Sequence, residues 1–192
     1  MNFEGKNHRD TLKEKLLRDS KDLLETIKTD EKLKDIYTKL EYIKLGELKY
    51  RNNIARYEAD DLSINAENIA AGLKTFVIIK TLLENGSLEN DGTMILDEPE
   101  IHLHPKWQLL LAELIVLIQK VFNMHILLNT HSPYFLHAIE VYSKHHGISK
   151  KCRYYLTELD EEEKTAHIKE VTGNTEEIYK LLAEPFDTLE LI

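Results

Sequence analysis

Two neighbouring carboxylates follow a short apolar segment near the middle of the sequence. Residues 93–96 are mostly apolar, and Asp97, Glu98 and Pro99 come directly after them. An apolar run this short favours a buried parallel strand over a helix. Open α/β sheets bind their ligands at the carboxyl ends of such strands. Successive residues of a strand point in opposite directions. One acid can therefore bind the hydration shell of a metal ion while its neighbour faces a water molecule. This arrangement suits Mg²⁺-dependent nucleotide hydrolysis.

A histidine is expected at the same edge of the sheet. Residues 107–122 are largely apolar and contain neither glycine nor proline, so they predict a buried helix. Residues 124–129 predict a second buried strand, which His131 follows closely. A strand, a helix of this length and a strand form a right-handed crossover that brings two parallel strands side by side. Asp97, Glu98 and His131 should therefore converge at one rim.

The segments LDEPEIHLHP and NTHSPYFL resemble the Walker B, D-loop and switch-histidine region of ABC-type ATPases. The branch concerned includes the RecF-like and OLD-like AAA-family ATPases of DNA repair and phage defence. Carried over residue by residue, the resemblance implies that Asp97 holds Mg²⁺ through water. It makes Glu98 the general base or water-orienting acid, and His131 the sensor of the γ-phosphate of ATP.

The resemblance also implies a D-loop from Glu100 to His104, which would contact the opposite protomer. In this branch, HLHP ends that loop and opens the next helix, with Pro105 in its first turn. An alternative interpretation makes His102 and His104 metal ligands, together with the nearby acids. No third cluster at ligand spacing accompanies the two histidines in the sequence.

A glycine-containing turn precedes a further apolar helix. Residues 67–76 read ENIAAGLKTF, and a helix start of this kind presents backbone N–H groups to phosphate. By position, this loop resembles the ABC signature, which closes on ATP held by the other protomer. The alternative is an ordinary helix N-terminus.

The signature-like loop departs from the family pattern. Ala70 replaces the usual serine and Ala71 the first glycine of the pair, whereas Gly72 is retained. The contact to the γ-phosphate in trans is thereby in question, since a hydroxyl donor is missing. Lys74 or Asn68 could compensate, so the resemblance implies nucleotide contacts from Ala70, Ala71, Gly72 and Lys74.

The phosphate-cradling loop of an ABC-type ATPase, GxxxxGK[ST], is absent from the sequence. Gly5 and Lys6 are followed by Asn7, and the first glycine is missing. The chain is therefore expected to be the second lobe, inactive in isolation, and to need a partner lobe or chain that carries Walker A. It would be a piece of a longer protein, one half of a split ATPase, or an inactive remnant.

Helical spacing of apolar residues extends over residues 7–46, with a break predicted at Thr29 and Asp30. Two interpretations remain open: a coiled-coil arm, or two amphipathic helices packed on the sheet. The predicted domains are this helical arm or hairpin, residues 1–46, and the ATPase C-terminal lobe, residues 47–192. Further short strands, a C-terminal hairpin and a last helix are predicted in the following ranges: 48–51, 54–58, 62–64, 152–158, 166–171 and 174–182.

Composition is that of an ordinary globular domain. The chain has 192 residues, 42% of them hydrophobic, and a formal net charge of −9, which argues against a surface that coats nucleic acid. We expect no membrane partner, because no apolar run has membrane-spanning length. The N-terminal residues lack the apolar core of a secretory signal, and the single cysteine, Cys152, permits a reducing compartment. These features predict a cytoplasmic protein.

The predicted fold class is α/β: the second lobe of a P-loop NTPase of the ABC type, with a mostly parallel sheet, preceded by a helical arm and without the Walker A lobe. The first functional hypothesis is a catalytic half-site for ATP and Mg²⁺, working in a homo-oligomer or head-to-tail dimer. The second is an inactive scaffold that recruits an effector such as a nuclease. A nucleic-acid ligand is also open. The uncovered part of the parallel sheet is expected to favour self-association.

Overall fold

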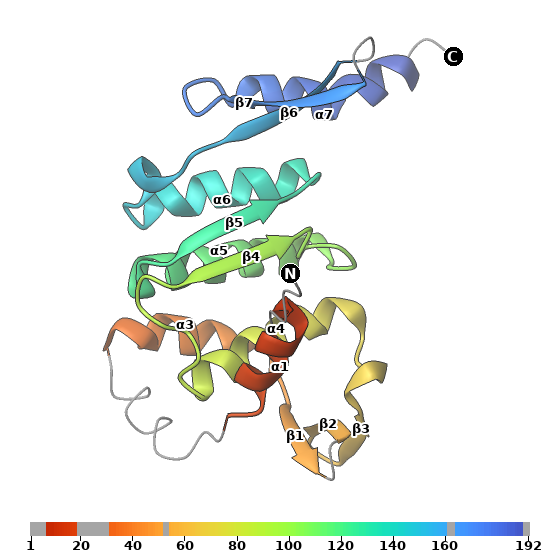
Figure 1. Cartoon of the computed structure of the whole chain (residues 1–192), viewed down its shortest axis with the longest axis vertical. Helices are drawn as coiled ribbons and strands as arrows, with labels where there is room; N and C mark the ends of the chain where they lie inside the picture. The colour runs from red at the N-terminus through yellow and green to blue at the C-terminus, as the bar shows by residue number, and fades with distance from the viewer. Residues whose placement is uncertain (1–6, 19–30, 52–53, 161–163, 190–192) are drawn as a thin grey trace, which may run out of the picture.

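Two parallel strands lie side by side near the middle of the molecule (Figure 1). The computed structural model describes residues 7–18, 31–51, 54–160 and 164–189. Strand β4 (Thr93–Asp97) pairs with β5 (His125–Asn129) in parallel, and helix α5 (Pro105–Phe122) connects them. The register joins Thr93 to His125 and Asp97 to Asn129, so both strands end level with each other. The predicted strand–helix–strand unit is confirmed.

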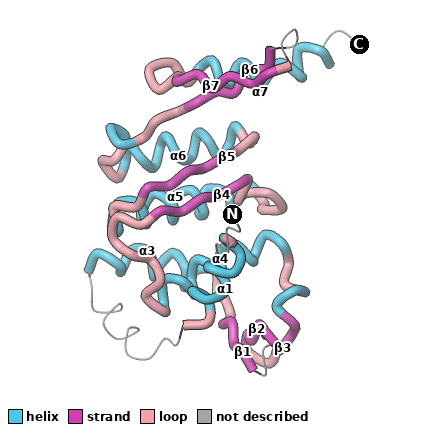
Figure 2. The backbone as a smooth tube through the Cα atoms, viewed as in Figure 1, coloured by secondary structure: helices cyan, strands magenta, loops and turns pink. Residues whose placement is uncertain are grey.

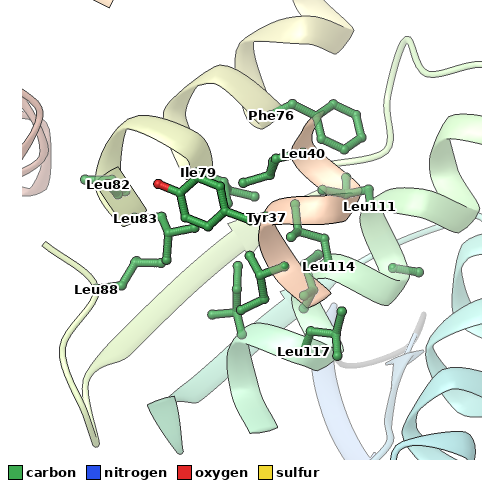
Figure 3. Packing of buried hydrophobic residues seen from close by; sticks show 14 of the residues in the cluster. Tyr37, Leu40, Phe76, Ile79, Leu82, Leu83, Leu88, Leu111, Leu114 and Leu117 are labelled. Carbon is green, nitrogen blue, oxygen red and sulfur yellow. The ribbon is translucent and has the colours of Figure 1, made fainter. Parts of the chain in front are cut away.

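The main hydrophobic core of the protein covers one face of the β4–β5 sheet. On one face Met94, Leu96, Ile126 and Leu128 pack against the main core. The core consists largely of side chains from α3 (Glu31–Tyr42), α4 (Ala71–Glu84) and α5, as the close view in Figure 3 shows. Helix α5 is apolar around most of its circumference, as expected for a helix covered on several sides.

The described N-terminal helices pack onto this core. Helix α1 (His8–Leu16) is capped by the side chain of Asn7, and near its end the carbonyl oxygen of Lys15 accepts hydrogen bonds from Asn85 (2.7 Å) and Ser87 (3.2 Å). Helix α3 contributes Ile36 to the main core, where its side chain is fully buried. Helix α3 is thus part of the main core rather than separate from it. The break predicted at residues 29–30 lies outside the described residues.

A small antiparallel sheet leads into the signature-like loop. Its strands are β1 (Glu47–Arg51), β2 (Ile54–Ala59) and β3 (Leu62–Asn65), which pair in sequence order. The short helix η1 (Ala66–Asn68) then connects β3 to α4. The hydroxyl oxygen of Tyr57 accepts a hydrogen bond from the backbone N–H of Gly46 at 2.8 Å, which ties the sheet to the end of the preceding segment. The hairpin and the third strand follow the sequence prediction.

After β5 the chain forms two further α-helices and a two-stranded hairpin (Figure 2). Helix α6 (Pro133–His145) has Ser132 as its N-cap and Pro133 at its first position, two residue types that favour a helix start. After η2 (Ser149–Lys151), strands β6 (Tyr155–Asp160) and β7 (Thr165–Glu170) form the predicted hairpin. Helix α7 (Glu176–Leu189) differs from the sequence prediction, which ended the helix before residue 184. It continues through Pro185, whose missing N–H removes one hydrogen bond of the helix.

The described strands form three small sheets, and only the β4–β5 pair is parallel. The structure is mixed α/β, but within the described residues the sheet is not mostly parallel, contrary to the sequence prediction. Antiparallel pairing is natural for β1–β3 and β6–β7, because each connection is a short turn. Among the described helices, none could span a lipid bilayer.

Candidate functional site

The candidate site lies where β4 and β5 end. The backbone N–H of Glu98 donates to the carbonyl oxygen of Asn129 at 3.0 Å, which extends the strand ladder by one bond. The side-chain amide of Asn129 donates to Asp97 Oδ1 at 3.3 Å. Asp97, the candidate metal residue, is exposed. Its carboxylate is thus held across the two strands from the side of β5.

Glu98 leaves the strand instead of continuing it. Its φ of +43° is in the left-handed region, which is uncommon for residues other than glycine. The expectation of two acids alternating on one strand is therefore wrong for Glu98, since β4 ends at Asp97. This backbone bend, rather than strand alternation, separates the directions of the two carboxylates. Such strained conformations cluster at functional sites.

Glu98 and His131 form a pair across the rim. His131 Nε2 lies 3.0 Å from Glu98 Oε1. The His131 side chain is 83% exposed and the Glu98 side chain 29% exposed, so the imidazole reaches into solvent while the carboxylate is partly shielded. Glu98 and His131, which follow the ends of β4 and β5, are therefore in contact. This agrees with the prediction that the two residues meet at one rim.

The loop after Glu98 consists of two successive turns. The N–H of Ile101 donates to the carbonyl of Glu98 at 3.1 Å, with Pro99 in the position that favours this turn. The N–H of Leu103 donates to the carbonyl of Glu100 at 3.0 Å. His102, at the third position of this second turn, has a φ of +65°. His104 then caps α5, its Nδ1 accepting from the N–H of Lys106 at 3.3 Å.

One residue of this loop points inward. The Glu100 side chain is only 4% exposed, and its Oε1 accepts a hydrogen bond from the Thr130 hydroxyl. The predicted contact of the D-loop with an opposite protomer therefore cannot involve this buried side chain as it lies here. Ile101, His102 and His104 are the exposed members of the loop.

The signature-like loop is held by backbone contacts. Helix α4 begins at Ala71, and the N-cap residue Ala70 makes no side-chain cap. Gly72 packs closely on the predicted D-loop: a Cβ at this position would lie 2.8 Å from both the carbonyl oxygen of His102 and Leu103 Cδ2. Lys74 donates from Nζ to the carbonyl oxygen of Glu67 at 2.9 Å. The loop therefore touches the segment that follows the catalytic candidates.

The donor set at the rim fits a magnesium ion bound largely by water and phosphate. Mg²⁺ commonly uses only one or two carboxylates and keeps several waters, and Asp97 offers one exposed carboxylate. In the described part of the chain, no group of three or more His, Cys, Asp or Glu side chains could hold a metal ion. The described residues therefore offer no such ligand group for the alternative metal site at His102 and His104.

Comparison with known proteins gives the family of the chain. The model of the AAA ATPase domain matches residues 4–136, which include β4, residues 100–104 and His131. The chain belongs to the AAA ATPase domain family.

Relatives of this AAA ATPase domain are longer proteins. The chain is similar to the Retron Vc95 probable ATPase of Vibrio cholerae serotype O1 biovar El Tor, at 28% identity over 66% of this chain and 25% of the relative. It is also similar to the Retron Ec83 probable ATPase of Escherichia coli, at 30% identity over 43% of this chain and 17% of the relative. The alignments thus span a quarter or less of these curated relatives.

A solved structure shares the fold of this AAA ATPase domain. It comes from work described as structural biochemistry of ATP-driven dimerization and DNA-stimulated activation of SMC ATPases. The TM-score is 0.51 at 13% identity, over 78% of this chain and 86% of that one. At this identity the likeness concerns the fold alone.

Sequence reasoning missed the polar residues that support the site. The sequence pattern assigns Asn129 and Thr130 no role beyond the end of a strand, and the resemblance places Glu100 in a loop that contacts the opposite protomer. A usable signal is present, because all three are polar and lie within two residues of Glu98 or His131. The inward direction of Glu100 depends on the two turns after Glu98 and could not be inferred from residue type.

Proposed function

We propose that this chain supplies one half of an ATP-hydrolysing site. In this proposal Asp97 binds Mg²⁺ through water, Glu98 orients or activates the attacking water, and His131 contacts the γ-phosphate of ATP. The observation that supports it best is the 3.0 Å contact between Glu98 and His131 at the ends of two parallel strands. A carboxylate that orients water is a recurring part of such sites. When bound, Mg²⁺ would neutralise charge on the phosphates.

The signature-like loop would act on a second nucleotide. In a head-to-tail dimer, the N–H groups at the start of α4 would approach the ATP of the other protomer, from Ala70, Ala71 and Gly72. Support comes from the missing side-chain cap, which leaves the helix start to an external acceptor. Lys74 would add positive charge. The SMC ATPase neighbour, described for ATP-driven dimerization, is consistent with such an assembly.

The phosphates would be held by another lobe that carries the Walker A loop. The exposed face of β4–β5 supports this part of the proposal: Ile95 is 62% exposed and Leu127 56% exposed. Parallel sheets are usually covered on both faces, whereas among the described residues the core covers one face of this sheet. We propose that the Walker A lobe covers the other face.

A second candidate function is an interaction module without turnover. One face of the C-terminal hairpin favours it, because Leu159 is 79% exposed and Ile168 75% exposed. The register pairs Thr157 with Ile168 and Leu159 with Ala166, so these apolar residues share a face. An exposed apolar face is typical of a docking surface for another protein. In this second proposal, the module binds an effector protein or a nucleic acid.

Substitution of Glu98 distinguishes the two functions. In the protein assembled with its Walker A lobe, Glu98→Gln should preserve ATP binding and slow hydrolysis by about 10²–10⁴-fold, since a general base is removed. Binding and single-turnover hydrolysis of ATP are measured on the same preparation. The matched control is Glu176→Gln, an exposed glutamate in the first turn of α7, which should leave turnover unchanged. Equal hydrolysis by Glu98→Gln and the wild type would reject the catalytic role.

A further inference from the structure

Glu100 is a buried acid beside an exposed site. Its neighbours in sequence include Glu98, which faces the rim, and Ile101, which is exposed. The Glu100 side chain instead turns away from solvent, and its Oε2 is buried without a hydrogen-bond partner among the described residues. Burying a carboxylate with so few partners is unfavourable, and an apolar residue would serve packing better. Packing alone therefore does not account for this side chain.

The partner of Glu100 lies next to His131. The Thr130 hydroxyl donates to Glu100 Oε1, and Thr130 Oγ1 itself accepts a hydrogen bond from the backbone N–H of Ser132 at 3.0 Å. Thr130 and Ser132 are the residues on either side of His131. One hydroxyl thus fixes the backbone before and after the histidine, and Glu100 fixes the direction of that hydroxyl.

Ser132 is anchored a second time from α5 and α6. Its hydroxyl donates to Gln108 Oε1 at 3.0 Å and accepts from the N–H of Phe135 at 3.2 Å. Gln108 in turn donates to the carbonyl oxygen of Leu103 at 3.2 Å, in the same loop as Glu100. The loop that carries Glu98 and the loop that carries His131 are therefore joined by Glu100 and by Gln108.

We propose that Glu100 is a positioning residue: through Thr130 it holds the backbone at His131 so that the imidazole reaches Glu98. The inference deepens the proposed function, because it assigns a support to the same pair. The contact itself exists in the chain without nucleotide, so it can be tested separately from ATP turnover.

The direct test is nuclear magnetic resonance of the 192-residue chain. The measured quantity is the cross-peak between the ring protons of His131 and the side-chain methylene protons of Glu98. Thr130→Val removes the hydroxyl at nearly constant volume, and Glu100→Leu removes the acceptor; each should weaken the cross-peak strongly. Thr130→Ser keeps the hydroxyl and should retain it. The double variant should lose no more than either single one, because both remove the same link.

The matched control is Glu113→Gln on α5. Glu113 is another largely buried acid, which pairs with Lys39 at 2.6 Å and lies 3.6 Å from His146 Nε2. Neither partner belongs to this loop network, so its substitution should leave the cross-peak unchanged. A cross-peak that persists in Thr130→Val would overturn the inference, as would its absence from the wild type. Loss in Glu113→Gln would also overturn it, since the contact would then respond to any change in the core. Thr130→Val decides the matter if Glu100→Leu does not fold.

Kinetics in the assembled protein separate this inference from the function. Thr130→Val should lower kcat by up to about 10²-fold with little change in KM for ATP, as expected for a displaced catalytic group. If Glu98→Gln hydrolyses ATP normally while the cross-peak pattern holds, the proposed function fails and the positioning role remains. If Glu98→Gln slows hydrolysis but Thr130→Val changes neither cross-peak nor kcat, the positioning role fails and the function remains.

Discussion

The rim at the ends of β4 and β5 differs in kind from the signature-like loop at the start of α4. At the rim, side chains contact one another across two strands, as Glu98 does with His131 and Asp97 with Asn129. At the start of α4, the residues are two alanines and a glycine, and the close contact is between Gly72 and the backbone of the D-loop. The rim offers chemistry through side chains, whereas Ala70, Ala71 and Gly72 offer only backbone groups.

This difference predicts two kinds of mutational response. Substitutions at the exposed or half-exposed rim residues should change chemistry with little loss of stability. Substitutions in the loop should change geometry first, because no side chain there carries a polar contact from Ala70 to Gly72. The two regions meet at His102 and Leu103, so a change at that contact tests both.

Among substitutions at the rim and in the signature-like loop, Gly72→Ala should lower stability the most. The added Cβ would meet His102 O and Leu103 Cδ2 at 2.8 Å, and backbone cannot move aside cheaply. Overpacking of this kind costs about 1–3 kcal/mol. Urea denaturation followed by circular dichroism measures the free energy of unfolding.

Gly173→Ala is the matched control for this substitution. A Cβ there would have no heavy atom within 4 Å, so stability should be unchanged or slightly raised. Equal stability of Gly72→Ala and Gly173→Ala would mean that the signature-like loop does not press on the D-loop, and the contrast between the two regions would lose its structural basis.

His102→Gly should have a smaller effect, in the opposite direction. The φ of +65° at His102 costs an ordinary residue about 1–2 kcal/mol, partly offset by the greater freedom of glycine in the unfolded chain. The expected gain in unfolding free energy is about 0.5–1 kcal/mol, with the contact to Gly72 preserved because it uses backbone. Ile101→Gly, at the exposed neighbouring position, should bring no gain. A loss of stability in His102→Gly would show that the imidazole itself supports the loop.

The elements around the site could be predicted from sequence because their patterns are local. The apolar runs of β4 and β5, the long apolar α5 and the Ser132–Pro133 start of α6 all follow from residue type and spacing. The meeting of Glu98 and His131 follows from them, since a parallel crossover places both strand ends together. The roles of Asp97, Glu98 and His131 in ATP chemistry stay predictions.

Other features depend on contacts that no local pattern encodes. The left-handed backbone of Glu98 and the burial of Glu100 arise from two turns and a threonine 30 residues away. The sequence leaves open whether the N-terminal helices form a coiled-coil arm or pack on the sheet, and in the structure α3 packs into the core with α4 and α5. An amphipathic stripe alone does not specify the element against which it packs. The length of α7 was underestimated, since Pro185 normally ends a helix.

The most direct test of the half-site proposal is a titration of the purified 192-residue chain with a fluorescent ATP analogue and Mg²⁺, with Asp97→Ala as the control. Without a Walker A loop in its sequence, the chain should show no saturable binding in the micromolar range, and Asp97→Ala should behave identically. Tight binding that depends on Asp97 would contradict the proposal, because the chain would then hold the phosphates with its own residues.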